Sequence, residues 1–227
     1  MLAPSVGKAT PRKVNSLAKV NLEDLTVSFQ SKILLSGQFS TLTRNLYGPL
    51  PVDSTINPRY LRKIWETESD IHAVVHDVKL NETDYYFPFK TSVDASYTLD
   101  GLVQEHDSKL VLDAGPLLCH VIYENFNSMG RQSDFFPDFV GSDTYACMLE
   151  FSRDIDFVLP PEEISLDNEF GIYKFSTQQT APNKILINSY FLIKQPYIEH
   201  SKTAAVEEIF KAIEKTESCT FTVTGKE

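Results

Sequence analysis

The stretch TYACMLEFSRDIDFVLPPEEISLDNEFGIYKFSTQQTAPNKILINSYFLI, residues 144–193, decides the fold class. Prolines and short polar runs divide it into four segments rich in aromatic and β-branched residues, at 144–151, 153–159, 170–176 and 184–193. Such side chains favour the half-buried surface of a pleated strand. The connections are too short for the helical crossovers that a parallel sheet requires. We therefore expect these segments to pair mainly as antiparallel strands.

Segments of the same character flank this stretch on both sides. Strands are expected at residues 25–35, 71–80, 85–89, 109–113, 117–126 and 219–224. The last is the clearest, because Cys219, Phe221 and Val223 alternate with three threonines, as in a strand with one buried face. The chain is therefore expected to be β-rich.

Three helices are expected among the strands. Asn57 followed by Pro58 is a typical helix start, which predicts a helix over residues 58–69. A short helix is expected over residues 98–106, and a final helix is expected to be capped by Ser201. The final helix has an apolar stripe formed by Val206, Ile209, Phe210 and Ile213. The predicted fold class is α+β and β-rich, with a mainly antiparallel sheet or sandwich and the C-terminal helix packed on it.

Charge is unevenly distributed along the chain. The 227 residues have a net charge of −10, yet the first twenty contain four basic residues and no acidic residue. This segment has few large apolar side chains and is interrupted by Pro4, Gly7 and Pro11. We therefore predict a flexible basic tail over residues 1–20 and a single β-rich α+β domain over residues 21–227.

The predicted tail offers a contact for anions. Lys8, Arg12 and Lys13 are its candidate binding residues, for an anionic membrane or a nucleic acid. The acidic body would repel both, so this contact is expected through the tail only. The composition of the segment is also compatible with a mitochondrial transit peptide, which leaves import with cleavage open as an alternative to an intracellular, cytoplasmic location. No run of 18 apolar residues occurs, so no transmembrane helix is expected.

A loop in the second half of the chain suggests contact with a partner protein. Residues 134–141 contain Phe135, Phe136 and Phe139 beside acidic residues. Exposed aromatic side chains are typical of binding surfaces. The alternative is that these rings fill the end of the hydrophobic core. The loop is therefore a candidate interface that a structure can test.

The expected helix over residues 58–69 is a second candidate contact. It carries Arg59, Arg62 and Lys63 opposite its apolar residues. A basic face on an acidic body favours an acidic partner. An ordinary solvated face is the alternative.

Patterns typical of catalysis are few. LVLDAG, residues 110–115, resembles the turn of retroviral-type aspartic proteases, but Ala114 stands where that family has a hydroxyl residue, and a hairpin turn explains the same string. His72 and His76 are four residues apart, which on the expected strand places them about 13 Å apart, too far to share a zinc ion. No metal ion or cofactor is expected.

These observations favour a non-catalytic binding or assembly protein. It would be a complex subunit or a structural protein, such as a virion matrix- or capsid-type component, that associates with a protein partner or with itself. The first alternative is a hydrolase whose site is assembled from distant residues, with Asp113, His72, His76 and His120 as candidates. The second is an organelle-imported protein with a cleaved N-terminal segment.

Overall fold

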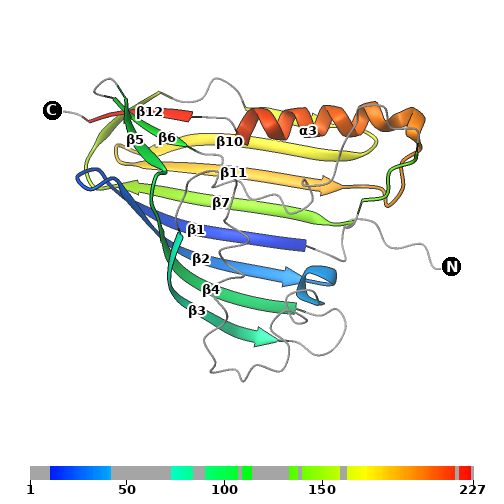
Figure 1. The fold of residues 1–227 in the computed structure, drawn as a ribbon, viewed down its shortest axis with the longest axis horizontal. Coiled ribbons are helices and arrows are strands. Elements are labelled where there is room, and N and C mark those ends of the chain that lie inside the picture. Colours follow the sequence, from blue (N-terminus) through cyan, green and yellow to red (C-terminus); the bar gives the residue numbers. More distant parts are fainter. Residues whose placement is uncertain are drawn as a thin grey trace.

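The computed structural model describes residues 11–41, 73–83, 90–106, 109–113, 133–137, 140–158, 163–217 and 220–225. Within these ranges the strands form two β-sheets, which Figure 1 shows with a helix beside them. The larger sheet contains β1 (Pro11–Asn21), β2 (Thr26–Ser36), β3 (Ala73–Thr83), β4 (Lys90–Leu99), β7 (Ser142–Phe151), β9 (Ile164–Asp167), β10 (Gly171–Ala181) and β11 (Lys184–Ile193). The smaller sheet contains β5 (Val103–His106), β6 (Lys109–Asp113), β8 (Ile155–Val158) and β12 (Thr220–Gly225). The helix is α3 (Thr203–Glu217), which follows the short 3-10 helix η2 (His200–Lys202).

The larger sheet consists of two antiparallel halves joined in the middle. Its strand order is β3-β4-β2-β1-β7-β11-β10-β9. Every neighbouring pair is antiparallel except β1 and β7, which are parallel. The predicted β-rich class is therefore confirmed, and the large sheet is mixed.

The first described strand corrects the prediction of a tail over residues 1–20. β1 lies in the interior of the large sheet, with Arg12 opposite Leu35 of β2 on one side and opposite Asp143 of β7 on the other. The segment looks tail-like because several of its inward positions, Arg12, Ser16 and Ala18, are polar or small, yet alternate side chains along it are buried. Pairing on both edges compensates for the missing large apolar side chains. The prediction is wrong for residues 11–20, and residues 1–10 lie outside the described ranges.

Small side chains in the middle of the large sheet make room for aromatic rings. Ala18 lies on β1 between Phe29 of β2 and Leu149 of β7, and all three are buried. The Phe29 ring stacks on Tyr97 of β4, with ring centroids 4.9 Å apart. Tight packing of this kind is typical of a protein interior, so a larger side chain at position 18 would displace its neighbours.

A polar seam lies next to these rings on the same buried face. Ser16 and Ser31 hydrogen-bond to each other at 2.7 Å, and the Ser31 hydroxyl is 3.1 Å from that of Tyr97. Cys147 lies opposite Ser16 on β7. Burial raises the pKa of the Cys147 thiol to about 12, so this thiol stays protonated near neutral pH.

The C-terminal helix packs on the large sheet as the sequence predicts. α3 contacts β10 and β9, and its stripe of Val206, Ile209, Phe210 and Ile213 is buried. The Tyr173 hydroxyl of β10 lies 2.5 Å from the Thr216 hydroxyl of α3, which joins the helix to the sheet. The α3 helix begins at Thr203, so Ser201 lies in η2 and is not its cap. The described helices contain no segment that is long and apolar enough to cross a membrane.

The structure confirms some of the other predicted elements and contradicts one. Strands over residues 25–35, 71–80, 109–113 and 184–193 are confirmed as β2, β3, β6 and β11. The short helix expected over residues 98–106 is wrong, because β4 continues to Leu99 and β5 begins at Val103 after a turn. Gly101 has a φ of 83° in that turn, a conformation that suits glycine. The segments 58–69, 85–89 and 117–126 lie outside the described residues.

The alternation over residues 219–224 predicts unequal effects of two neighbouring substitutions in β12. Phe221 is fully buried and β12 pairs with both β6 and β8, so Phe221→Ala is expected to lower the free energy of unfolding by about 3–5 kcal/mol. Thr222 is half-buried on the opposite face, and Thr222→Ala should lower it by less than about 1 kcal/mol. Urea denaturation of both variants measures the difference. Equal losses would contradict the burial of one face only.

Candidate functional site

The aromatic loop divides into one buried and one exposed ring. Phe135 is buried, and its backbone forms two hydrogen bonds with Ile198, of 2.8 and 2.9 Å. Its ring lies 6.0 Å from that of Phe170, the residue before β10. Phe135 is therefore part of the hydrophobic core, which is the alternative that the sequence left open for this loop.

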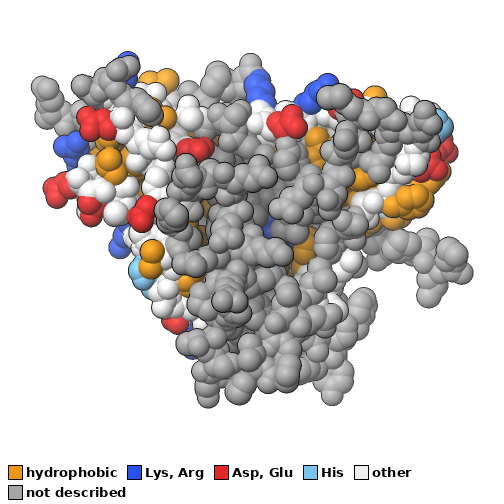
Figure 2. Space-filling model, viewed as in Figure 1, with side chains coloured by type: hydrophobic (Ala, Val, Ile, Leu, Met, Phe, Trp, Pro, Cys, Tyr) orange, Lys and Arg blue, Asp and Glu red, His pale blue; other side chains and the backbone are white. Residues whose placement is uncertain are grey.

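The next residue, Phe136, lies on the surface. Its side chain is 65% exposed, and its ring lies 5.1 Å from the ring of Tyr197, which is 40% exposed. Both residues lie close to the segment that connects β11 to α3, at the right-hand end of the molecule in Figure 1. Figure 2 shows exposed hydrophobic side chains next to acidic and histidine side chains at this end. We call Phe136 and Tyr197 the aromatic pair.

Asp134 positions Tyr197, one member of the aromatic pair. Its carboxylate accepts a hydrogen bond of 2.9 Å from the Tyr197 hydroxyl and one of 2.8 Å from the backbone N–H of His200. These hydrogen bonds lower the pKa of Asp134, with the His200 N–H contributing most. The hydrogen bond from the Tyr197 hydroxyl to Asp134 raises the pKa of Tyr197. Asp134 therefore stays ionised at pH values where an ordinary aspartate begins to protonate, and the arrangement persists at mildly acidic pH.

The structure describes two of the basic residues that were expected to bind an anionic partner, and one is buried while the other is exposed. Arg12 is buried and forms a bidentate ion pair with Asp143, with Nε 2.9 Å from Oδ1. The expectation that Arg12 binds an anionic partner is therefore wrong, because its guanidinium is engaged inside the fold. Lys13 follows on the opposite face of β1 and is exposed. Lys8, Arg59, Arg62, Lys63 and Phe139 lie outside the described residues.

The hydrolase candidates that the structure describes lie on different sheets. His76 is exposed on β3 of the large sheet, where its Nε2 atom is 2.7 Å from the Thr98 hydroxyl. Asp113 ends β6 in the smaller sheet. His72 and His120 are outside the described ranges. Among the residues that the structure describes, no group of three His, Cys, Asp or Glu side chains is arranged to hold a metal ion.

Two features of the surface were not expected from the sequence. Tyr197 completes the aromatic pair although it lies 63 positions after Asp134 in the chain, and its contact depends on the bridge between Phe135 and Ile198. The second is a shallow groove of about 670 Å³ on the exposed face of the large sheet. Its floor crosses β1, β2, β4 and β3, whose order in the sheet differs from their order in the sequence, so strand order had to be known before the groove could be found.

Comparisons with known proteins identify a related segment but no activity. A family model described as a domain of unknown function with a solved structure (DUF3858) matches residues 117–223, slightly less than half of the chain. One similar solved structure is a protein from Parabacteroides distasonis ATCC 8503, provisionally described as a protease, with 10% identity and a TM-score of 0.30. The alignment covers 97% of this chain and 41% of that one, so this chain spans less than half the length of that protein. No curated protein matches.

Proposed function

We propose that this chain is a non-catalytic protein-binding module of a larger assembly, and that the aromatic pair is an anchor for its partner. The observation that carries the proposal is that Phe136 is 65% exposed although the residue before it is buried in the core and its own ring contacts that of Tyr197. Exposed aromatic residues on a fixed backbone are typical of interface hot spots.

The contacts that position the aromatic pair support this role. Phe135 anchors the backbone in the core directly before Phe136, and Asp134 fixes the hydroxyl of Tyr197. A side chain that is already ordered loses little conformational entropy on binding, which favours affinity. Asp134 also places a negative charge beside the rings, so a partner with a basic residue next to an apolar pocket would fit both.

Phe136→Ala should separate binding from folding. The free energy of unfolding is expected to change by less than about 1 kcal/mol, because the ring is mostly exposed. Phe135→Ala is the matched comparison and should lower it by about 3–5 kcal/mol, since that ring is buried. Thermal and urea denaturation of the two single variants measure this difference. A large loss of stability in Phe136→Ala would show that this ring is part of the hydrophobic core.

The binding role itself is tested by photo-crosslinking in the full chain. Benzoylphenylalanine replaces Phe136 in one variant and Val158 in the other, which is 66% exposed at the end of β8 and serves as the control. We expect one dominant crosslinked species at position 136, formed either with a second copy or with another protein, and no dominant species at position 158. Equal, diffuse crosslinking at both positions would refute the proposal.

A further inference from the structure

The bridge between Phe135 and Ile198 places the aromatic pair and two acidic side chains on the same side of the backbone. Phe135 and Ile198 are buried, and in paired extended segments the residues on either side of a buried position face the other way. By this register Asp134 lies opposite Glu199, as the two rings lie opposite each other. The hydrogen bond from the backbone N–H of His200 to Asp134 agrees with it. We call the aromatic pair together with Asp134 and Glu199 the anchor site.

The anchor site carries negative charge that no neighbouring lysine neutralises. The pKa of Tyr197 is raised mainly by its hydrogen bond to Asp134, and the charge of Glu199 also contributes, so both carboxylates lie within electrostatic reach of this hydroxyl. The lysines of the segment that connects β11 to α3 are already in ion pairs, which are Lys194 with Asp167 and Lys202 with Glu169. Within the described residues, neither carboxylate of the anchor site is paired with a lysine or an arginine. The site therefore favours a cationic group of a partner.

Both carboxylates have acceptor positions that the fold does not use. Glu199 is exposed and comes directly before η2, yet its side chain makes no capping hydrogen bond to that helix. Asp134 accepts one hydrogen bond from the Tyr197 hydroxyl and one from the backbone N–H of His200. A carboxylate offers about four acceptor positions, so Asp134 can still accept from a partner while it positions Tyr197.

The two rings determine where a cation can lie. Their centroids are 5.1 Å apart and their planes are tilted by 51°, so the rings contact each other and leave no room for a cation between them. A cation can lie over the exposed part of Phe136, because the face of an aromatic ring attracts positive charge within about 6 Å of the ring centroid. Asp134 is two positions before Phe136, which is about 6.6 Å along an extended chain, so one flat cationic group can reach both the ring and the carboxylate.

We propose that the anchor site binds an arginine side chain of a partner polypeptide, which stacks on Phe136 and donates hydrogen bonds to Asp134 and Glu199. A guanidinium is planar and carries five N–H donors, so it can stack on a ring and bind carboxylates at the same time. The ammonium of lysine is a compact, strongly hydrated charge that cannot stack in this way. The inference rests on the proposed anchor role of the aromatic pair, and it adds the residue type that the partner presents.

The test begins with random short peptides displayed on phage and selected against the full chain. Dissociation constants of the labelled peptides are measured by fluorescence anisotropy at pH 8, because a protonated His200 ring, whose Nδ1 atom lies 3.6 Å from Oδ1 of Asp134, would compete with the arginine. We expect the selected peptides to share an arginine. Replacing it with citrulline, which keeps the shape and removes the charge, should weaken binding about tenfold, and replacing it with lysine about threefold.

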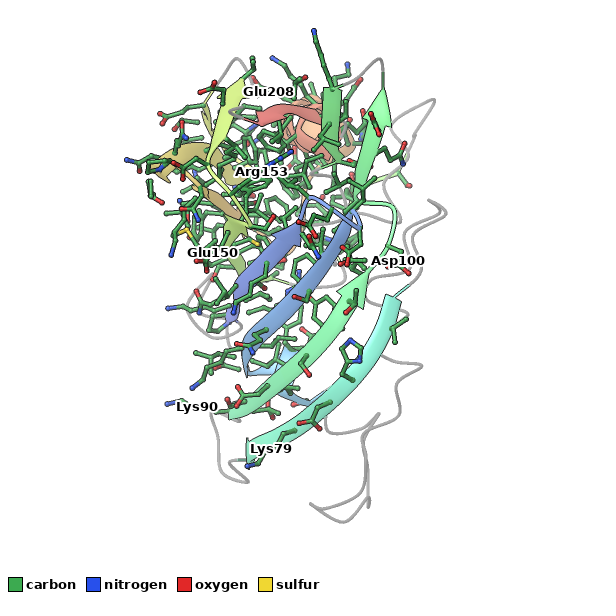
Figure 3. The ribbon with its side chains drawn as sticks, turned by 90° about the vertical axis from the view of Figure 1, so that its left-hand side faces the viewer. Lys79, Lys90, Asp100, Glu150, Arg153 and Glu208 are labelled. Carbon is green, nitrogen blue, oxygen red and sulfur yellow. The ribbon has the colours of Figure 1, made fainter. Side chains whose placement is uncertain are left out.

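Substitutions in the chain then locate the arginine. Phe136→Ala should weaken binding of the selected peptides about tenfold, and Glu199→Gln about threefold. Glu199→Gln should leave the binding of the citrulline peptide unchanged, because the two changes remove the same interaction. Asp100→Asn is the matched control and should bind as the native chain does. It also removes one exposed acid, but Asp100 directly follows β4, and Figure 3 shows it from the end of the molecule opposite the anchor site.

The arginine and the anchor role can fail separately. Selected peptides that require Phe136 but no arginine would refute the arginine and leave the anchor role standing. Arginine peptides that bind Phe136→Ala as tightly as the native chain, or no selected peptide at all, would also refute the inference, while crosslinking at position 136 decides the anchor role independently. Equal weakening by Asp100→Asn and Glu199→Gln would show a general effect of charge and no site.

Discussion

Deletion of residues 1–20 is expected to abolish cooperative folding. The deletion removes almost all of β1, which pairs with β2 over ten residues and with β7 over ten residues. It also removes the buried side chains of Val14, Ala18 and Val20, and it leaves the edges of β2 and β7 unpaired in the middle of the sheet. Domains of this size are stable by about 5–15 kcal/mol, and loss of an interior strand exceeds that margin.

Circular dichroism and thermal denaturation of the shortened chain measure this effect. Lys19→Ser serves as a control within the same strand, because Lys19 is exposed on the outward side of β1, and it should change stability by no more than about 0.5 kcal/mol. If the shortened chain melts at the native temperature with the native spectrum, residues 11–20 do not form part of the sheet.

Arg12→Met is expected to lower the free energy of unfolding by about 3–5 kcal/mol. The side chains of Arg12 and Asp143 are 6% and 2% exposed, and their ion pair spans the one parallel junction of the large sheet. Removing the arginine leaves a buried carboxylate without its cation, and the desolvation of that charge is then uncompensated. The guanidinium also lies 6.0 Å from the ring of Phe39, so a contact with the ring is lost as well.

Replacing both partners distinguishes the ion pair from simple packing. Arg12→Met combined with Asp143→Leu removes both charges and keeps apolar volume, so a large part of the lost stability should return. Urea denaturation of the single and double variants gives the coupling free energy between the two positions. If the double variant loses the sum of the two single losses, the charges are not coupled and the pair is not what stabilises the junction.

The β-strands of this chain could be predicted because their local signals agree with the fold. In Thr220–Gly225 apolar side chains alternate with threonines, and Lys184–Ile193 is rich in aromatic and β-branched residues; the structure buries one face of each. The stripe on α3 is similarly explicit, since four apolar residues recur at helical spacing. Pattern and burial coincide in these elements because each has one face on the core.

β1 shows why a local signal can fail. Its inward side chains include Arg12, Ser16 and Ala18, which are typical of a solvated segment. They are buried because distant strands supply what they lack: Asp143 neutralises the arginine, Ser31 hydrogen-bonds Ser16, and Phe29 fills the space beside Ala18. The partners are 131 residues away for Arg12, and no window of local sequence contains that information.

The features of the candidate site also divide into those that local sequence predicts and those that depend on the tertiary structure. The sequence by itself determined that the chain is β-rich, that its final helix has a buried face, and that the loop with Phe135 and Phe136 merits attention, since these features depend on residue types at local spacing. Only the tertiary structure decided which of the two rings is buried, and that Tyr197 joins Phe136. The physical reason is that strand order and register, set by packing across the whole chain, decide which distant side chains become neighbours.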